Sequence, residues 1–193
     1  MKRNIAIFAS GSGSNAENLI RYFQENERFR VTLVLTDRAE AFVIERAKRL
    51  HVPCQYLPAT AWREGTEVME LLASHDICFV VLAGFLRRVP DSILQAFPER
   101  IVNIHPSLLP KYGGKGMYGD HVHRAVVAAG EAQSGITIHH VNEHYDEGAI
   151  IFQATCPVAP CDTPEAVAQK VHALEYEHFP PVVEAQLIKA FPL

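Results

Sequence analysis

The sequence has little of what marks a membrane, nucleic-acid-binding or disulfide-rich protein. No apolar run approaches the roughly 20 residues that a membrane-spanning helix needs. Lys and Arg number 18 against 22 Asp and Glu, a net charge of −4, so we expect no general affinity for nucleic acid or an anionic membrane surface. There are only 4 cysteines and no C-x-x-C pair. We therefore expect a protein of the reducing cytoplasm, with Cys54 and Cys78 as buried free thiols.

Histidine, by contrast, is abundant, and its clusters raise the question of a metal site. There are 10 histidines, with the pairs His121-x-His123 and His139-His140. No H-E-x-x-H helix motif and no cysteine-rich set of four ligands accompanies them. We therefore expect no metal.

The first half of the chain alternates strand-like and helix-like patterns. The apolar periodicity predicts strands and helices in the following ranges: strands at 5–9, 31–35, 55–57, 77–82 and 101–104, and helices at 15–26 with Asn15 as N-cap, 42–50 and 62–73. Such alternation predicts an α/β fold, a Rossmann-like, mostly parallel twisted sheet with flanking helices and right-handed crossovers.

The pattern changes in the second half. A short helix is expected at 121–129, and strands at 135–141 and 149–158 are separated by a turn, which predicts a C-terminal antiparallel hairpin extension. Thr163-Pro164 opens a further helix, which we expect to break at Pro180-Pro181. No linker or repeat interrupts the chain, so we expect a single domain over 1–193.

Small residues follow the first expected strand. In the segment Ser10–Asn15, Ser10-Gly11-Ser12-Gly13-Ser14-Asn15, backbone N–H groups at a helix start can surround a phosphate. With Ala16 in the third position, the segment also fits the G-x-G-x-x-A variant of the dinucleotide pattern, so nicotinamide binding stays open. Asp37 is the one candidate there for a ribose contact. We favour a phosphate site over a plain turn.

A second group of polar residues follows the fifth expected strand. Asn103 and His105 are two residues apart and therefore point to the same side of the strand. An amide can stabilise a developing oxyanion, and an imidazole can transfer a proton. Asp146, in the expected turn of the hairpin, would raise the pKa of His105 and keep it charged if the two side chains meet.

These segments together resemble a known family. The run Asn103–Pro110, with Val81–Arg87 before it and Asp146-Glu147-Gly148 after it, is similar to the folate-dependent formyltransferases. Ser12–Asn15 and Glu175 make the chain most similar to the branch that acts on glycinamide ribonucleotide. The resemblance implies transfer of a formyl group from 10-formyltetrahydrofolate to the primary amine of that ribonucleotide, in purine biosynthesis, without a metal.

The resemblance also implies which residues form the site. Catalysis would rest on Asn103, His105 and Asp146. Residues matching the substrate site are Gly13, Ser14, Asn15, His172, Ala173, Leu174 and Glu175. Residues matching the folate site are Arg63, Leu86, Arg87, Arg88, Val89, Asn103, Asn142, Glu143, His144, Tyr145 and Asp146. Residues 1–100 would then form the phosphate-binding half and 101–193 the catalytic and folate-binding half.

Two other functions stay open on the sequence. One is hydrolysis of formyltetrahydrofolate, and the other is a non-catalytic nucleotide-binding module that uses only Ser10–Asn15. We expect neither the regulatory domain of a deformylase nor the nucleic-acid-binding domain of a methionyl-tRNA formyltransferase. The expected partners are the ribonucleotide and a reduced folate, on a monomer or homodimer. The chain departs from the family in its longer loop Gly113–Gly119 and in Arg88, where an apolar residue is common.

Overall fold

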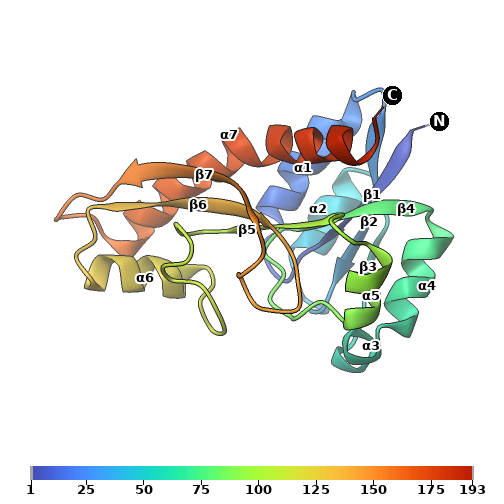
Figure 1. Ribbon diagram of the computed structural model, residues 1–193, viewed down its shortest axis with the longest axis horizontal. Coiled ribbons are helices and arrows are strands. Elements are labelled where there is room, and N and C mark those ends of the chain that lie inside the picture. The colour runs from blue at the N-terminus through green and yellow to red at the C-terminus, as the bar shows by residue number, and fades with distance from the viewer. Residues whose placement is uncertain (1, 193) are drawn as a thin grey trace.

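The structure, a computed structural model, describes residues 2–192 and is built on one seven-stranded sheet (Figure 1). Its strand order is β3-β2-β1-β4-β5-β6-β7. The strands are β1 (Arg3–Phe8), β2 (Phe29–Thr36), β3 (Cys54–Tyr56), β4 (Ile77–Leu82), β5 (Ile101–His105), β6 (Gln133–His140) and β7 (Ile150–Pro157). The first five are parallel, and β6 and β7 add antiparallel pairs at one edge. The expected α/β fold with a C-terminal hairpin is confirmed.

Helices cover both faces of this sheet. They are α1 (Ser14–Gln24), α2 (Val43–Arg49), α3 (Ala59–Glu64), α4 (Thr66–Ser74), α5 (Asp91–Ala96), α6 (Asp120–Ala128) and α7 (Pro164–Ala190). Apolar side chains of α1, α2, α6 and α7 form one buried cluster with the sheet, and those of α3, α4 and α5 form a second on the opposite face. In Figure 1, α7 runs beside α1 along one side, and α3, α4 and α5 lie on the other. Covering on both faces explains why β4 reads as a nearly continuous apolar run, Ile77–Leu82.

The helix expected at 62–73 is wrong, because the chain forms two helices there. Gly65 takes a left-handed conformation (φ 78°) that ends α3 and starts α4. A β-carbon at this position would lie 2.6 Å from the hydroxyl oxygen of Ser92 and 3.1 Å from the β-carbon of Pro90. The neighbouring helix α5, which the apolar periodicity did not predict, therefore packs directly onto this turn.

Two helix-end expectations are also wrong. Asn15 is not the N-cap of α1, because the cap is Gly13 and Asn15 lies inside the first turn. The last helix does not break at Pro180-Pro181, but continues to Ala190. Pro180 has no N–H for the carbonyl oxygen of Tyr176, and this oxygen instead accepts a hydrogen bond from the side-chain amide of Asn18 (3.0 Å). A side chain of α1 thus takes the place of the missing backbone donor.

The state of the cysteines and the length and hydrophobicity of the helices can be compared with the cellular environment expected from the sequence. The four cysteines are free, and Cys54 and Cys78 are half-buried rather than fully buried. Burial raises the pKa of Cys54 to about 11, so its thiol stays protonated at neutral pH. Within residues 2–192, no helix combines the length and the hydrophobicity needed to cross a membrane.

Substituting Gly65 should test how the turn between α3 and α4 determines packing. We expect Gly65→Ala to lower the free energy of unfolding by more than 2 kcal/mol, because left-handed strain of about 1–2 kcal/mol adds to the contact with Ser92. Gly130→Ala is the matched control, since Gly130 also has positive φ but no atom near its added β-carbon. Urea unfolding of both variants measures the difference. Equal losses in the two variants would contradict this account of the turn.

Candidate active site

A cleft of about 550 Å³ opens beyond the carboxyl ends of β1, β4 and β5. The strand order reverses at β1: the chain passes from β1 to β2 and β3 on one side and then crosses over to β4 and β5 on the other, and ligands of α/β sheets bind at such a point. Three groups of residues line the cleft: Gly11–Asn15 after β1, Ala83–Leu86 after β4, and Asn103–Pro106 at the end of β5. The loop Gly114–Asp120 and the side chains of His123, Tyr145, Asp146, His172 and Glu175 complete it.

At the start of α1, the segment Gly13–Asn15, which we call the anion seat, lines the cleft. The first hydrogen bond of the helix is donated by Glu17 N–H to the carbonyl oxygen of Gly13. The N–H groups of residues 14–16 thus precede the helical ladder, and the Gly13 cap contributes no side-chain bond to them. Such free N–H groups, with the positive end of the helix dipole, suit a phosphate.

Helix α2 packs against this loop and hydrogen-bonds to it. Gly13 has φ 74°, and a β-carbon there would lie 2.4 Å from the side chain of Val43. The Val43 N–H donates to the carbonyl oxygen of Gly11 (3.2 Å), and Arg46 Nε donates to that of Ser12 (2.8 Å). Arg46 also pairs with Glu17. The carbonyl groups of Gly11 and Ser12 thus both accept hydrogen bonds from α2.

Glu175 of α7 lies at the centre of a polar cluster beside the anion seat. It is 4% exposed, and its Oε2 accepts hydrogen bonds from the side-chain amide of Asn15 (2.9 Å) and from Nδ1 of His172 (2.8 Å). Asn15 therefore contributes its side chain to Glu175 and only its backbone N–H to the anion seat. The hydrogen bond to Glu175 raises the pKa of His172 above its ordinary value.

Asn103 lies at the other end of the cleft, paired across the sheet with His139 of β6. Its side-chain amide donates to Nε2 of His139 (3.0 Å), whose Nδ1 donates to the carbonyl oxygen of His140 (2.8 Å). The carbonyl fixes the proton on Nδ1, which leaves Nε2 as an acceptor. His139 thereby orients the amide of Asn103 toward the cleft.

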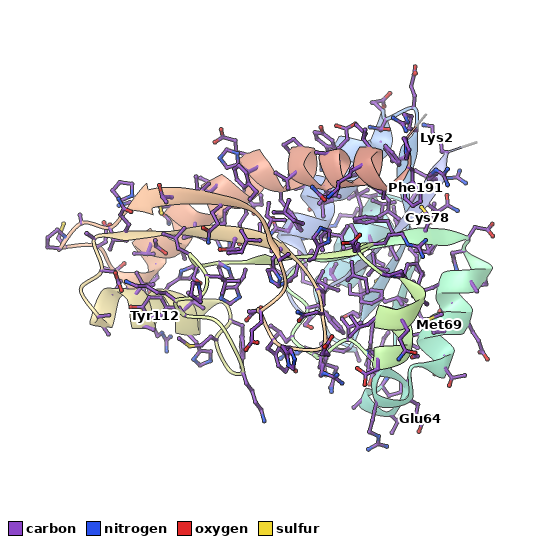
Figure 2. All side chains as sticks on the ribbon, in the orientation of Figure 1. Lys2, Glu64, Met69, Cys78, Tyr112 and Phe191 are labelled. Atoms are coloured by element: carbon purple, nitrogen blue, oxygen red, sulfur yellow. The ribbon has the colours of Figure 1, made fainter. Side chains whose placement is uncertain are left out.

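His105 is buried between a carbonyl and a carboxylate. Its Nε2 donates to the carbonyl oxygen of Tyr112 (2.7 Å), which lies between β5 and α6 (Figure 2), and its Nδ1 lies 3.5 Å from Oδ2 of Asp146. Burial lowers the pKa of His105 below its ordinary value, and the Asp146 carboxylate offsets only part of that effect. The expectation that Asp146 keeps His105 charged is therefore wrong for the ligand-free site, because desolvation outweighs the ion pair.

Asp146 is the point where several segments meet. Besides His105, it lies 3.6 Å from Nε2 of His139 and accepts a hydrogen bond from the Gly114 N–H (2.9 Å). Burial alone would raise the pKa of Asp146, but His139, His105 and the Gly114 amide together hold it below its ordinary value. The carboxylate is therefore ionised at neutral pH. The long glycine-rich loop is tied to it through Gly114.

A smaller groove of about 50 Å³ adjoins the cleft on the side of β4, and both are lined by Asn103 and Asp146. Of the residues expected at the folate site, nine line this groove: Arg87, Arg88, Val89, Asn103, Asn142, Glu143, His144, Tyr145 and Asp146. Leu86 lines the cleft instead. Arg88 Nε donates to the carbonyl oxygen of Glu143 (3.2 Å), which connects the two walls of the groove. Asp37, the candidate for contact with a nicotinamide ribose, instead forms an ion pair with Arg87, whose Nε lies 2.7 Å from Oδ2 of Asp37.

Three expected site residues lie away from the cleft and the groove. Arg63 is exposed in the last turn of α3, Ala173 is exposed on α7, and Leu174 packs against the apolar core. On a helix, residues one or two apart point in different directions, so the segment 172–175 can direct only His172 and Glu175 into the cleft.

Three contributors were not expected: His139, His123 and the carbonyl of Tyr112. The alternation along β6 opposite Asn103 could have indicated His139.

The titratable groups of the cleft do not suggest a metal centre. Across residues 2–192, no group of three or more His, Cys, Asp and Glu side chains is arranged to hold a metal ion. The imidazoles of His105, His139 and His172 are engaged with a carbonyl, an amide and a carboxylate of the protein, respectively.

Comparison with known proteins identifies the family. The sequence profile of the family described as formyl transferase matches residues 3–183. The chain belongs to this formyl transferase family. Among its relatives is the phosphoribosylglycinamide formyltransferase of Bacillus subtilis, 36% identical, covering 96% of this chain and 95% of that protein. A chloroplastic phosphoribosylglycinamide formyltransferase of Arabidopsis thaliana is 39% identical over 95% of this chain.

Solved structures of formyl transferases share the fold. The crystal structure of phosphoribosylglycinamide formyltransferase from Bacillus halodurans superposes with a TM-score of 0.89 at 37% identity, covering 99% of this chain and 98% of that one. The chain spans only 65% and 61% of two plant relatives, from Arabidopsis thaliana and Vigna unguiculata.

The opposite environments of His105 and His172 should separate their titrations. We expect NMR titration of the imidazole C–H signals to place the pKa of His105 below about 6.5 and that of His172 above it, the ordinary value lying between. Folding stability should therefore lose the contribution of His172 as pH rises through its raised pKa, and lose that of His105 as pH falls below about 6.5. Asp146→Asn should lower the pKa of His105 further and leave His172 unchanged. A His105 pKa above 6.5 would refute the dominance of burial.

Proposed function

We propose that the chain transfers the formyl group of 10-formyltetrahydrofolate to the primary amine of glycinamide ribonucleotide, in purine biosynthesis. The observation that carries the proposal is the order of groups along one cleft. An anion seat at Gly13–Asn15 lies beside the Glu175 cluster, Asn103 and Asp146 line both the cleft and the smaller groove, and His105 lines the cleft. A ribonucleotide has the same order of phosphate, sugar and amine, and the groove leads to the amine end.

We propose that the folate carries its formyl group to this junction through the groove. The main chain of residues 142–146 and the segment 86–89 would hold the pteridine, because the groove is narrow and its walls are joined by Arg88. The reaction needs no redox change, and the proposed partners are only the ribonucleotide and the reduced folate. The cytoplasm is the proposed site of the reaction.

The proposed chemistry follows from the states of the three polar side chains. The neutral amine attacks the formyl carbon, and the negative charge that develops on the formyl oxygen is stabilised by the amide N–H of Asn103. Nδ1 of His105, unprotonated in the free site, takes the proton that the attacking nitrogen loses. Asp146, 3.5 Å away, stabilises the imidazolium that forms. The proton then passes to N10 of the folate as its bond to the formyl carbon breaks.

The proposed function predicts that loss of the Asp146 charge stops turnover while the fold survives. We expect Asp146→Asn to lower kcat by about 100-fold or more, within the range typical of general acid–base catalysis, because His105 can no longer be stabilised as an imidazolium. Asn also tolerates the left-handed conformation of residue 146 (φ 56°). Glu147→Gln, the same chemical change at the next and exposed residue, is the control and should retain activity.

The assay follows loss of the formyl group from 10-formyltetrahydrofolate with and without glycinamide ribonucleotide. Loss only when the ribonucleotide is present supports transfer. Equal loss in its absence would point to hydrolysis, and no loss at all would favour a nucleotide-binding module. Near-normal turnover by Asp146→Asn would remove Asp146 from the mechanism.

A further inference from the structure

We infer that His123 binds a ribose hydroxyl of the ribonucleotide and so determines specificity for the sugar; this inference rests on the proposed function. His123 lies on α6 and lines the cleft, although only 2% of its surface is exposed. A polar ring this deeply placed normally has hydrogen-bond partners. Within residues 2–192, neither nitrogen of His123 makes a hydrogen bond to another residue, and Nδ1 is fully enclosed.

The enclosure of Nδ1 indicates which ring nitrogen of His123 carries the proton. A proton on Nδ1 would be a buried N–H without an acceptor, so the neutral ring carries its proton on Nε2. Because the ring forms part of the cleft wall, Nε2 is the nitrogen left to meet a ligand, and it meets that ligand as a donor.

The surroundings of His123 indicate a sugar rather than a phosphate as its ligand. The ring centroid lies 6.4 Å from that of His172, which is bonded to Glu175, so His123 adjoins the polar cluster next to the anion seat. Burial lowers the pKa of His123, and the nearby His172 lowers it further, so the ring is neutral at pH 7. The backbone N–H groups at the start of α1 already suit the phosphate, so the neutral donor of His123, beside the Glu175 cluster, is left for an uncharged hydroxyl oxygen of the sugar.

The inference is tested by pairing enzyme variants with altered substrates. We expect His123→Phe to raise KM for glycinamide ribonucleotide about tenfold, the effect of roughly one hydrogen bond, with KM for the folate changed less than twofold. His123→Gln, which retains an amide donor near the position of Nε2, should recover part of the loss. His123→Gln also covers the case in which the Phe variant fails to fold.

Substrate analogues distinguish a hydrogen bond to the sugar from a structural effect. Of the 2′-deoxy and 3′-deoxy ribonucleotides, one should be a poorer substrate for the wild-type protein but show no such penalty with His123→Phe. Unchanged KM for the ribonucleotide in His123→Phe, or the same deoxy penalties in both proteins, would overturn the inference while leaving the proposed function intact. Failure of the wild-type protein to formylate the ribonucleotide would overturn the proposed function itself.

Discussion

The half-enclosed carboxylate of Asp146 is the constraint on which the site depends. A carboxylate taken out of water needs compensating charge or hydrogen bonds. Here the amide of Gly114, in the loop between β5 and α6, donates a hydrogen bond to it, and ring nitrogens of His105 on β5 and His139 on β6 lie 3.5 and 3.6 Å from its oxygens. Three separate segments thus meet at one side chain, which fixes their positions relative to one another.

The antiparallel edge of the sheet makes this meeting possible. Because β6 runs against β5, His139 lies opposite Asn103, and Thr137 lies opposite His105. The hydroxyl of Thr137 donates to the carbonyl oxygen of Ser107 (2.7 Å) and accepts from the Leu109 N–H (2.9 Å). The segment that leaves β5 is thus braced by the strand that orients the amide of Asn103. A parallel strand in this place would have required a long crossover instead.

Much of this arrangement could be predicted from the sequence, because it depends on local patterns. The alternation of apolar segments predicted the parallel sheet, and the carboxyl ends of its strands located the cleft at Gly11–Asn15 and Asn103–Pro106. Asp146 was singled out from the expected turn of the hairpin, and the resemblance to the family grouped it with Asn103 and His105 and supplied Glu175, which is far from these segments in the sequence. Periodicity could not predict the break at Gly65, since the apolar spacing continues through it and only the packing of α5 requires it.

What the sequence could not supply were balances between opposing effects. The ionisation of His105 depends on whether desolvation or the Asp146 carboxylate dominates, and that comparison needs the depth of burial. The exposure of Arg63 depends on the direction of α3, which follows from the turn at Gly65. His123 and His139 were visible only as members of histidine pairs, and the pairs drew attention to metals rather than to single contacts.

The prolines within α7 affect the orientation of a site residue. The carbonyl that Pro180 leaves free belongs to Tyr176, and Asn18 takes it, while Asn15, one turn earlier on α1, holds the adjacent Glu175. Side chains three apart on one helix thereby fix two consecutive residues of the other, which prevents α7 from rotating about its own axis. An interior proline usually breaks a helix. Here the carbonyl that it leaves without a backbone donor instead bonds to α1, and this second contact between the two helices helps to hold the Glu175 carboxylate in its orientation.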